Sequence, residues 1–247
     1  MLAIIGGSGL YSLGDEFHLG EQCARQTPYG ETSADVLLGR WQDVEIAFLP
    51  RHGPGHLVPP HLVNYRANLW ALKQAGVSKI IAVNAVGGIS ADMAPSTIAL
   101  PQQLIDYSWG REHSFCDGHD AVVQHVDFSR PYSAALQISL KRAAAQLGLA
   151  IVESGTYGCT NGPRFETAAE IRRMRGDGCS IVGMTGMPEA GLARELGIEY
   201  ASLALVVNWA AGIADSEISM DQIMANLERG IQQLRPLLLA AARLIEV

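Results

Sequence analysis

The chain alternates short, mostly apolar runs with longer stretches in which apolar residues recur every three or four positions. Runs of strand length that are apolar at every position are typical of strands covered on both faces. The periodic stretches between them predict amphipathic helices. The pattern therefore predicts an α/β fold with a mixed central β-sheet flanked by helices. We expect strands at 2–5, 44–49, 79–83, 180–184 and 200–207, and helices at 62–75, 131–146, 166–175, 188–196 and 220–246.

Length and composition favour one domain over residues 1–247. The sequence has 247 residues, 48% of them hydrophobic and 17% charged, which is enough to bury a large core. No repeat, low-complexity segment or Pro/Gly/Ser-rich linker divides it. The net charge of −7 and the lack of a Lys/Arg run argue against nucleic acid or an anionic membrane as a partner.

Targeting and cysteine patterns point to the cytoplasm. No apolar segment approaches the roughly 20 residues that span a bilayer, and the first residues lack the pattern of a secretory signal. The four cysteines form no Cys-x-x-Cys pair, which argues against a zinc ribbon or a disulfide framework. We therefore expect a cytoplasmic protein with reduced thiols.

A glycine loop, IIGGSGLY, follows the first apolar run, at the edge of a sheet where α/β proteins bind ligands. A dinucleotide fingerprint that begins at Gly7 and Gly9 fails, because Ser12 stands where the third glycine belongs. A Walker loop needs a Gly-Lys pair, which is absent, and a nucleophile elbow around Ser8 fails at Leu10. Two interpretations remain open: an oxyanion site of backbone N–H groups and one hydroxyl, or a plain tight turn.

The second strand exit places Arg51, His52 and His56 on a glycine-punctuated loop, RHGPGH. A planar guanidinium binds oxyanions with two parallel hydrogen bonds, although a surface salt bridge would also explain Arg51. Two histidines four apart suit a metal only on a helix, and the sequence GPG between them disfavours a helix. We therefore expect an anion site here and no metal.

The longest stretch without a periodic pattern is 108–130. Connections of this length are usually functional or lie at interfaces. His113 and His119 within it are expected to face solvent or an interface rather than to bind a ligand.

Six ordered motifs resemble those of one enzyme family over nearly the full length: IIGGSGLY, RHG-x-x-H, VNYRANLWALK, NAVGG, GPRFET-x-AE and MTGMPEA-x-LARELGI. The chain is similar to the trimeric purine nucleoside phosphorylases and methylthioadenosine phosphorylases. Within that family it resembles the S-methyl-5′-thioinosine phosphorylases, particularly at residues 83–89, 102–107 and 203–208.

The resemblance implies phosphorolysis, in which a purine nucleoside and phosphate give a free base and a pentose 1-phosphate. Inorganic phosphate is a co-substrate, and neither a cofactor, a metal nor a covalent intermediate is needed. Positioning and placed charge can supply such catalysis, with phosphate attacking C1′ and stabilising the cationic sugar. The implied phosphate contacts come from Ser8, Arg51, His52, the backbone around Asn84 and Ala85, and Thr185. Asn84 replaces the threonine common in the family, so its backbone is expected to matter rather than its side chain.

Two polar residues favour a 6-oxopurine over adenine. The Glu166 carboxylate can accept from N1–H, and the Asn208 amide can donate near O6 and N7 of the departing base. With Arg51, these are the expected catalytic residues. Adenine-directed relatives carry serine after the phenylalanine and an Asp-x-Asp where Asn208, Trp209 and Ala210 stand here, so the chain departs from the adenine pattern. Glu166 has an alternative interpretation as an acid at a helix N-terminus, and no role is assigned to Trp209.

Apolar residues complete the expected substrate site. Phe165 and Met184 resemble a wall against base and ribose, with ordinary core as the alternative. Met220 and Ile223 lie three apart on one helix face, where hydroxyl-accepting relatives place histidine and methylthio-accepting relatives place valine. They favour a 5′-methylthio group. The alternative is that they belong to an apolar stripe by which the C-terminal helix packs into the core. His125 looks like the residue that a neighbouring subunit contributes, which implies a homotrimer with a shared active site.

Three functions therefore compete. The first is phosphorolysis of S-methyl-5′-thioinosine to hypoxanthine and 5-methylthioribose 1-phosphate in purine salvage. The second is a general inosine and guanosine phosphorylase, and cleavage of methylthioadenosine is disfavoured by Glu166 and Asn208. The third is a non-catalytic nucleoside-binding protein, against which the retained Arg51, Thr185, Glu166 and Asn208 argue.

Overall fold

The computed structural model describes residues 1–116, 118, 123–214 and 217–246. Most of the strands in this part of the chain belong to one mixed sheet, ordered β2-β5-β6-β1-β7-β11-β10-β9, with β12 paired to β7 and to β8. Strands β3 and β4 form a separate pair. The expected α/β fold with a mixed central sheet is confirmed. The strands are β1 (Leu2–Gly6), β2 (Phe17–Cys23), β3 (Gln26–Thr27), β4 (Gly30–Glu31), β5 (Val36–Trp41), β6 (Val44–Pro50), β7 (Lys79–Gly88), β8 (Ile98–Ala99), β9 (Gln103–Asp106), β10 (Thr156–Cys159), β11 (Ile181–Gly183) and β12 (Glu199–Trp209).

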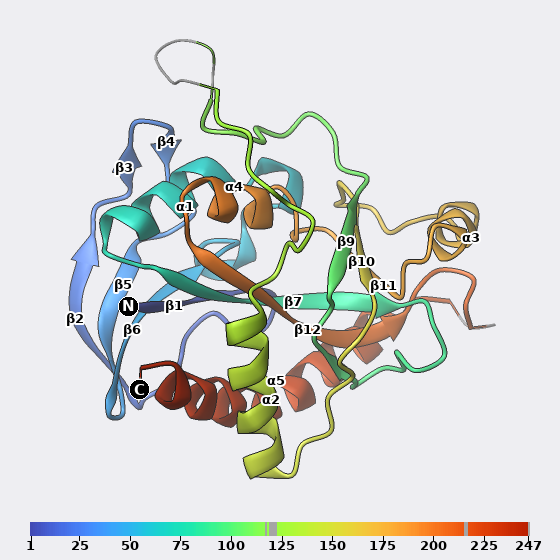
Figure 1. Cartoon of the computed structure of the whole chain (residues 1–247). Helices are drawn as coiled ribbons and strands as arrows, with labels where there is room; N and C mark the ends of the chain where they lie inside the picture. The colour runs from blue at the N-terminus through green and yellow to red at the C-terminus, as the bar shows by residue number, and fades with distance from the viewer. Residues whose placement is uncertain (117, 119–122, 215–216, 247) are drawn as a thin grey trace.

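Helices cover both faces of this sheet (Figure 1). Helices α1 and α4 pack on one face, where α1 buries Tyr65, Leu69 and Leu72 against β1 and β6. Helices α2 and α5 pack together on the other face over a second apolar cluster. None of the helices in the described residues combines the length and apolarity that crossing a bilayer requires. The α-helices are α1 (Tyr65–Gln74), α2 (Ala134–Leu147), α3 (Ala168–Gly176), α4 (Glu189–Glu195) and α5 (Met220–Glu246), and two 3₁₀ turns span Pro54–His56 and Pro60–Leu62.

Side-chain caps fix where several helices begin. Asn64 accepts a hydrogen bond from the Ala67 N–H at the start of α1 (3.1 Å). At α3, Thr167 and Glu170 form a capping box, in which each side chain accepts from the other residue's backbone N–H. These caps satisfy N–H groups that have no partner within the helix.

The parallel strands β6, β1, β7 and β12 lie side by side and end at the same edge of the sheet. The loops that follow β1 and β6, and the last residues of β7 and β12, therefore converge. This convergence brings together residues far apart in sequence, and it places the candidate site.

Candidate functional site

A cavity of about 550 Å³ lies at this edge of the sheet. Its wall includes twelve of the residues that the sequence predicted for phosphate and substrate: Ser8, Arg51, His52, Ala85, Phe165, Glu166, Met184, Thr185, Asn208, Ala210, Met220 and Ile223. Three predicted residues, Asn84, Trp209 and His125, do not line it in this chain.

The glycine loop is a turn that also lines the cavity. The Leu10 N–H donates to the Gly7 carbonyl (3.1 Å), which closes the turn around Ser8. A Cβ at Gly7 would stand 2.5 Å from the Val83 carbonyl oxygen and 3.1 Å from Nη1 of Arg51, so only glycine allows this approach. The interpretation as a tight turn is confirmed, and the turn places Ser8 at the cavity wall, while the oxyanion site stays a prediction.

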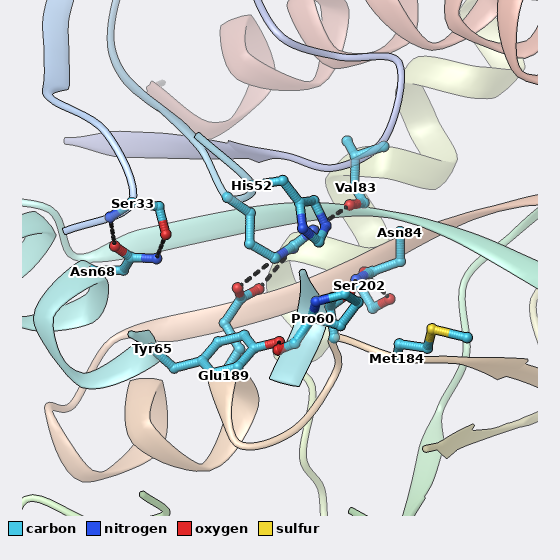
Figure 2. Close-up of polar contacts among 12 residues, drawn as sticks. Ser33, His52, Pro60, Tyr65, Asn68, Val83, Asn84, Met184, Glu189 and Ser202 are labelled. Atoms are coloured by element: carbon cyan, nitrogen blue, oxygen red, sulfur yellow. Dashed lines mark hydrogen bonds and ion pairs between the residues drawn. The ribbon is translucent and has the colours of Figure 1, made fainter. Parts of the chain in front are cut away.

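Arg51 is fully buried and held by a carboxylate that the sequence analysis did not identify. Its Nε and Nη2 donate to Oε2 and Oε1 of Glu189 at 2.7 and 2.8 Å, and Nη1 donates to the Val83 carbonyl (3.0 Å). Dashed lines at Glu189 and Val83 mark these bonds in Figure 2. Tyr200 donates to Glu189 Oε1 (2.8 Å) and fixes the carboxylate in turn. The alternative of a surface salt bridge is wrong, because both side chains are 0% exposed.

This arrangement leaves the guanidinium charged and oriented. Burial alone disfavours the charged form, but the Glu189 carboxylate outweighs it and raises the pKa of Arg51 above its ordinary value. Glu189 and Val83 accept from three of the five guanidinium N–H groups, and Arg51 is among the residues that line the cavity, so the two remaining N–H groups are candidates to bind a ligand there. An oxyanion with two acceptors fits such a pair of donors.

His52 is neutral at physiological pH. Burial, and then the positive charge of Arg51, lower its pKa to about 3. Its Nδ1 lies 2.8 Å from the Val58 carbonyl, which can only accept, so Nδ1 carries the proton and Nε2 has a free lone pair. The ring packs against that of His56, with centroids 4.3 Å apart and ring planes tilted by 37°.

Asn84 supports the site from behind rather than lining it. The Asn84 side chain is buried, its Nδ2 donates to Thr185 Oγ1 (2.9 Å), and its Oδ1 accepts from Ser202 (2.9 Å). Figure 2 shows Asn84 beside Ser202. Thr185 Oγ1 accepts from Asn84, its side chain also hydrogen-bonds Tyr157, and Thr185 lines the cavity. The expectation that the Asn84 backbone contacts phosphate stays a prediction.

Glu166 lies two residues before α3 and faces the cavity. Its Oε1 accepts from the Thr160 hydroxyl (2.6 Å), and burial raises the pKa of the carboxyl group. The capping box of α3 uses Glu170, and Glu166 lies just before the helix, so its interpretation as an acid at the helix N-terminus stays open. A half-buried carboxylate with one oxygen engaged can accept a hydrogen bond from a ligand with the other.

Asn208 stands near the end of β12. Its Nδ2 donates to the Trp209 carbonyl (2.7 Å), which orients the amide. The amide nitrogen has a second hydrogen and can donate it into the cavity. Trp209 therefore contributes through its backbone, while Ala210 lines the wall.

Apolar side chains form the remaining wall and the mouth. Phe165 and Met220 are 42% and 57% exposed at the cavity, so neither belongs to the core. Ile223 is 8% exposed and serves both the core and the wall. Met184 packs against Gly162, where φ is +61° and a Cβ would stand 2.4 Å from the methionine sulfur. Glycine is thus required to keep Met184 in the wall.

His125 is exposed and does not reach the cavity of its own chain. Its contribution to a neighbouring subunit stays a prediction. His113 lies near Asp106, with Nδ1 and Oδ2 3.9 Å apart, and His119 lies outside the described residues. In the described part of the chain, no three or more His, Cys, Asp or Glu residues gather as a metal site would require.

A second missed residue, Arg111, connects two loops of the wall. Its guanidinium donates to the carbonyls of Asn161 and Met184, both at 2.8 Å, and also to those of Thr160 and Met187. The residue is 7% exposed, and these carbonyls lie in the loops that carry Glu166 and Thr185. Sequence offered no signal for this role, because most of the partners are backbone carbonyls.

Comparison with protein families shows which family of enzymes the chain belongs to. The family model described as the phosphorylase superfamily matches residues 1–243. The chain belongs to the phosphorylase superfamily. A probable S-methyl-5′-thioinosine phosphorylase of Xanthomonas campestris pv. campestris is 49% identical over 245 residues, covering 98% of this chain and 97% of the relative. A 6-oxopurine nucleoside phosphorylase of Pyrococcus furiosus is 44% identical over 249 residues, covering 99% and 92%.

Solved structures agree on the fold of this phosphorylase. The methylthioadenosine phosphorylase from Schistosoma mansoni in complex with tubercidin superposes with a TM-score of 0.92 at 33% identity, covering 99% of this chain and 91% of that one. The resemblance inferred from the six motifs is confirmed, and the chain is a nucleoside phosphorylase by family.

Proposed function

We propose that this phosphorylase cleaves S-methyl-5′-thioinosine with inorganic phosphate to hypoxanthine and 5-methylthioribose 1-phosphate. The observation that carries the proposal is the content of one cavity: a buried guanidinium with two free N–H groups, a carboxylate and an amide for a 6-oxopurine, and an apolar mouth. Relatives about half identical to this chain are described as probable S-methyl-5′-thioinosine phosphorylases.

At the phosphate end, Arg51, Ser8 and the Thr185 hydroxyl donate to the anion. The C1′–N9 bond breaks as a phosphate oxygen bonds to C1′, and the purine leaves with the bonding electron pair and gains a proton. The fixed donors need no reorganisation as the sugar becomes cationic. The reaction uses phosphate as a co-substrate and no cofactor.

At the base end, Glu166 accepts from N1–H and Asn208 donates near O6 and N7 of the departing purine. Adenine reverses the donor and acceptor at N1 and at the 6-substituent. A mismatched base would leave buried polar groups without partners, at a cost of about 1–3 kcal/mol each. Methylthioadenosine is therefore a poor substrate in this proposal.

At the 5′ end, Met220 and Ile223 favour a methylthio group over a hydroxyl. A general 6-oxopurine phosphorylase is the second candidate, because Met220 is 57% exposed and an open mouth can leave a 5′-hydroxyl hydrated. A homotrimer in which His125 completes a neighbour's site, and a cytoplasmic location, remain predictions.

The test is incubation of the purified protein with methylthioinosine, inosine, methylthioadenosine or adenosine, each with and without phosphate, followed by chromatography of the free base. We expect phosphate-dependent release of hypoxanthine from methylthioinosine and little release of adenine. Preferential release of adenine would refute the base assignment. No phosphate-dependent release from any substrate would refute catalysis.

A further inference from the structure

The position of Asn208 depends on an irregularity in β12. Val206 pairs with Val86 of β7, and the next pair is Asn208 with Gly87, so Val207 is an extra residue in the ladder. Such a bulge re-aims the side chains that follow it. Val207 and Asn208 both line the cavity, so the extra residue lies at the cavity wall beside Asn208.

A side chain on α5 supports this bulge. The Nδ2 of Asn226 donates to the carbonyl of Val207 (2.7 Å), and Nη2 of Arg229 donates to Asn226 Oδ1 (2.5 Å). The arginine therefore fixes which end of the Asn226 amide faces the strand. The hydrogen bond satisfies a carbonyl next to buried side chains, where an unpaired acceptor is unfavourable.

Asn226 is not needed to attach the helix. Leu227, Ile231 and Leu234 of α5 are each at most 7% exposed and belong to the large apolar cluster under the sheet. This burial holds α5 in place without a polar contact. The Asn226 amide contacts β12 at the bulge beside Asn208.

We propose that Asn226 is a positioning residue for Asn208: by holding the bulge at Val207, it keeps the Asn208 amide aimed at the departing base. The inference rests on the proposed function. The Asn226→Asp substitution keeps the shape but places a carboxylate against the Val207 carbonyl. It should lower kcat/KM for methylthioinosine about 10- to 100-fold, the scale expected for a small misplacement of a reacting group.

A double-mutant cycle with Asn208→Ala tests this. If Asn226 acts through Asn208, Asn226→Asp has its full effect in the otherwise unchanged enzyme and almost none when Asn208 is already alanine. The KM for phosphate is expected to stay unchanged throughout. Gln222→Glu is the matched control, since it makes the same amide-to-carboxylate change at an exposed position of α5 and should leave kcat/KM unaffected.

The outcomes separate the possibilities. If Asn226→Asp lowers kcat/KM by the same factor with and without Asn208→Ala, or also weakens phosphate binding, the inference is overturned and Asn226 has a general structural role. An unchanged kcat/KM in Asn226→Asp would overturn it as well. If the unsubstituted enzyme releases no base from any purine nucleoside, the proposed function fails instead. Calorimetry of hypoxanthine binding to the four proteins of the cycle then tests the coupling between Asn226 and Asn208 without turnover.

Discussion

The ion pair between Arg51 and Glu189 gives the sharpest prediction, because both side chains are fully buried. In Glu189→Gln the side chain keeps its shape but loses its charge. A glutamine can accept only through its oxygen, so one of the two bonds at 2.7 and 2.8 Å is replaced by two donors facing each other. The Arg51 guanidinium is then buried without a counter-ion.

Removing one partner of a buried pair typically costs about 3–5 kcal/mol of unfolding free energy. We expect that loss in phosphate-free buffer. Phosphate supplies a new anionic partner for Arg51, so it should stabilise Glu189→Gln more than the unsubstituted protein at equal concentration. The two free N–H groups of Arg51 are the contacts through which this compensation acts.

The assay is urea unfolding at fixed protein concentration, with and without phosphate. Glu228→Gln is the control, because Glu228 is exposed on α5 and its substitution should change stability by no more than about 0.5 kcal/mol. A loss below about 1 kcal/mol in Glu189→Gln, typical of exposed pairs, would refute the reasoning. So would equal stabilisation of both proteins by phosphate.

Three further predictions concern other parts of the cavity. Arg111→Lys keeps the charge but cannot bridge several carbonyls, so we expect a higher KM for the nucleoside and a loss of about 1–3 kcal/mol in urea unfolding; unchanged values would contradict its role as a connector. The pKa of His52 is lowered to about 3, whereas an unfolded histidine titrates near ~6.5. Between these pKa values the unfolded chain binds one more proton, so the free energy of unfolding falls by up to about 1.4 kcal/mol per pH unit as pH drops below ~6.5. In His52→Gln this loss between pH 7 and pH 5 should be absent from urea unfolding curves. The same loss of unfolding free energy in both proteins would be inconsistent with a buried neutral ring. Met220→Ser should lower kcat/KM for methylthioinosine about 3- to 10-fold through lost apolar contact, with inosine little affected, as measured by steady-state kinetics; an equal loss for both substrates would place Met220 away from the 5′ group.

The fold could be predicted where strands are buried on both faces. The apolar runs that became β1, β6 and β12 were found because nearly all of their residues are buried. Strand β7 continues five residues past the predicted end at 83, because β11 and β12 pair with a segment that resembles a glycine-rich loop. Strand β2 was missed, since its residues are mostly exposed and no apolar pattern marks it.

The candidate site could be predicted where chemistry follows a strand exit, as at Arg51, Thr185 and Asn208. The partners of these residues could not be predicted. Glu189 lies 138 residues from Arg51 and occurs in the first turn of a helix, where an acid is ordinary. The bulge at Val207 could not be predicted from the sequence either, because it depends on how β12 pairs with β7.

The most direct test of the account is a competition between methylthioinosine and inosine at equal concentration with excess phosphate, following the disappearance of each nucleoside. The ratio of the two rates gives the ratio of their kcat/KM values. The apolar mouth at Met220 and Ile223 predicts that methylthioinosine disappears much faster. Equal rates, or faster loss of inosine, would contradict the assignment of a 5′-methylthio substrate to this cavity.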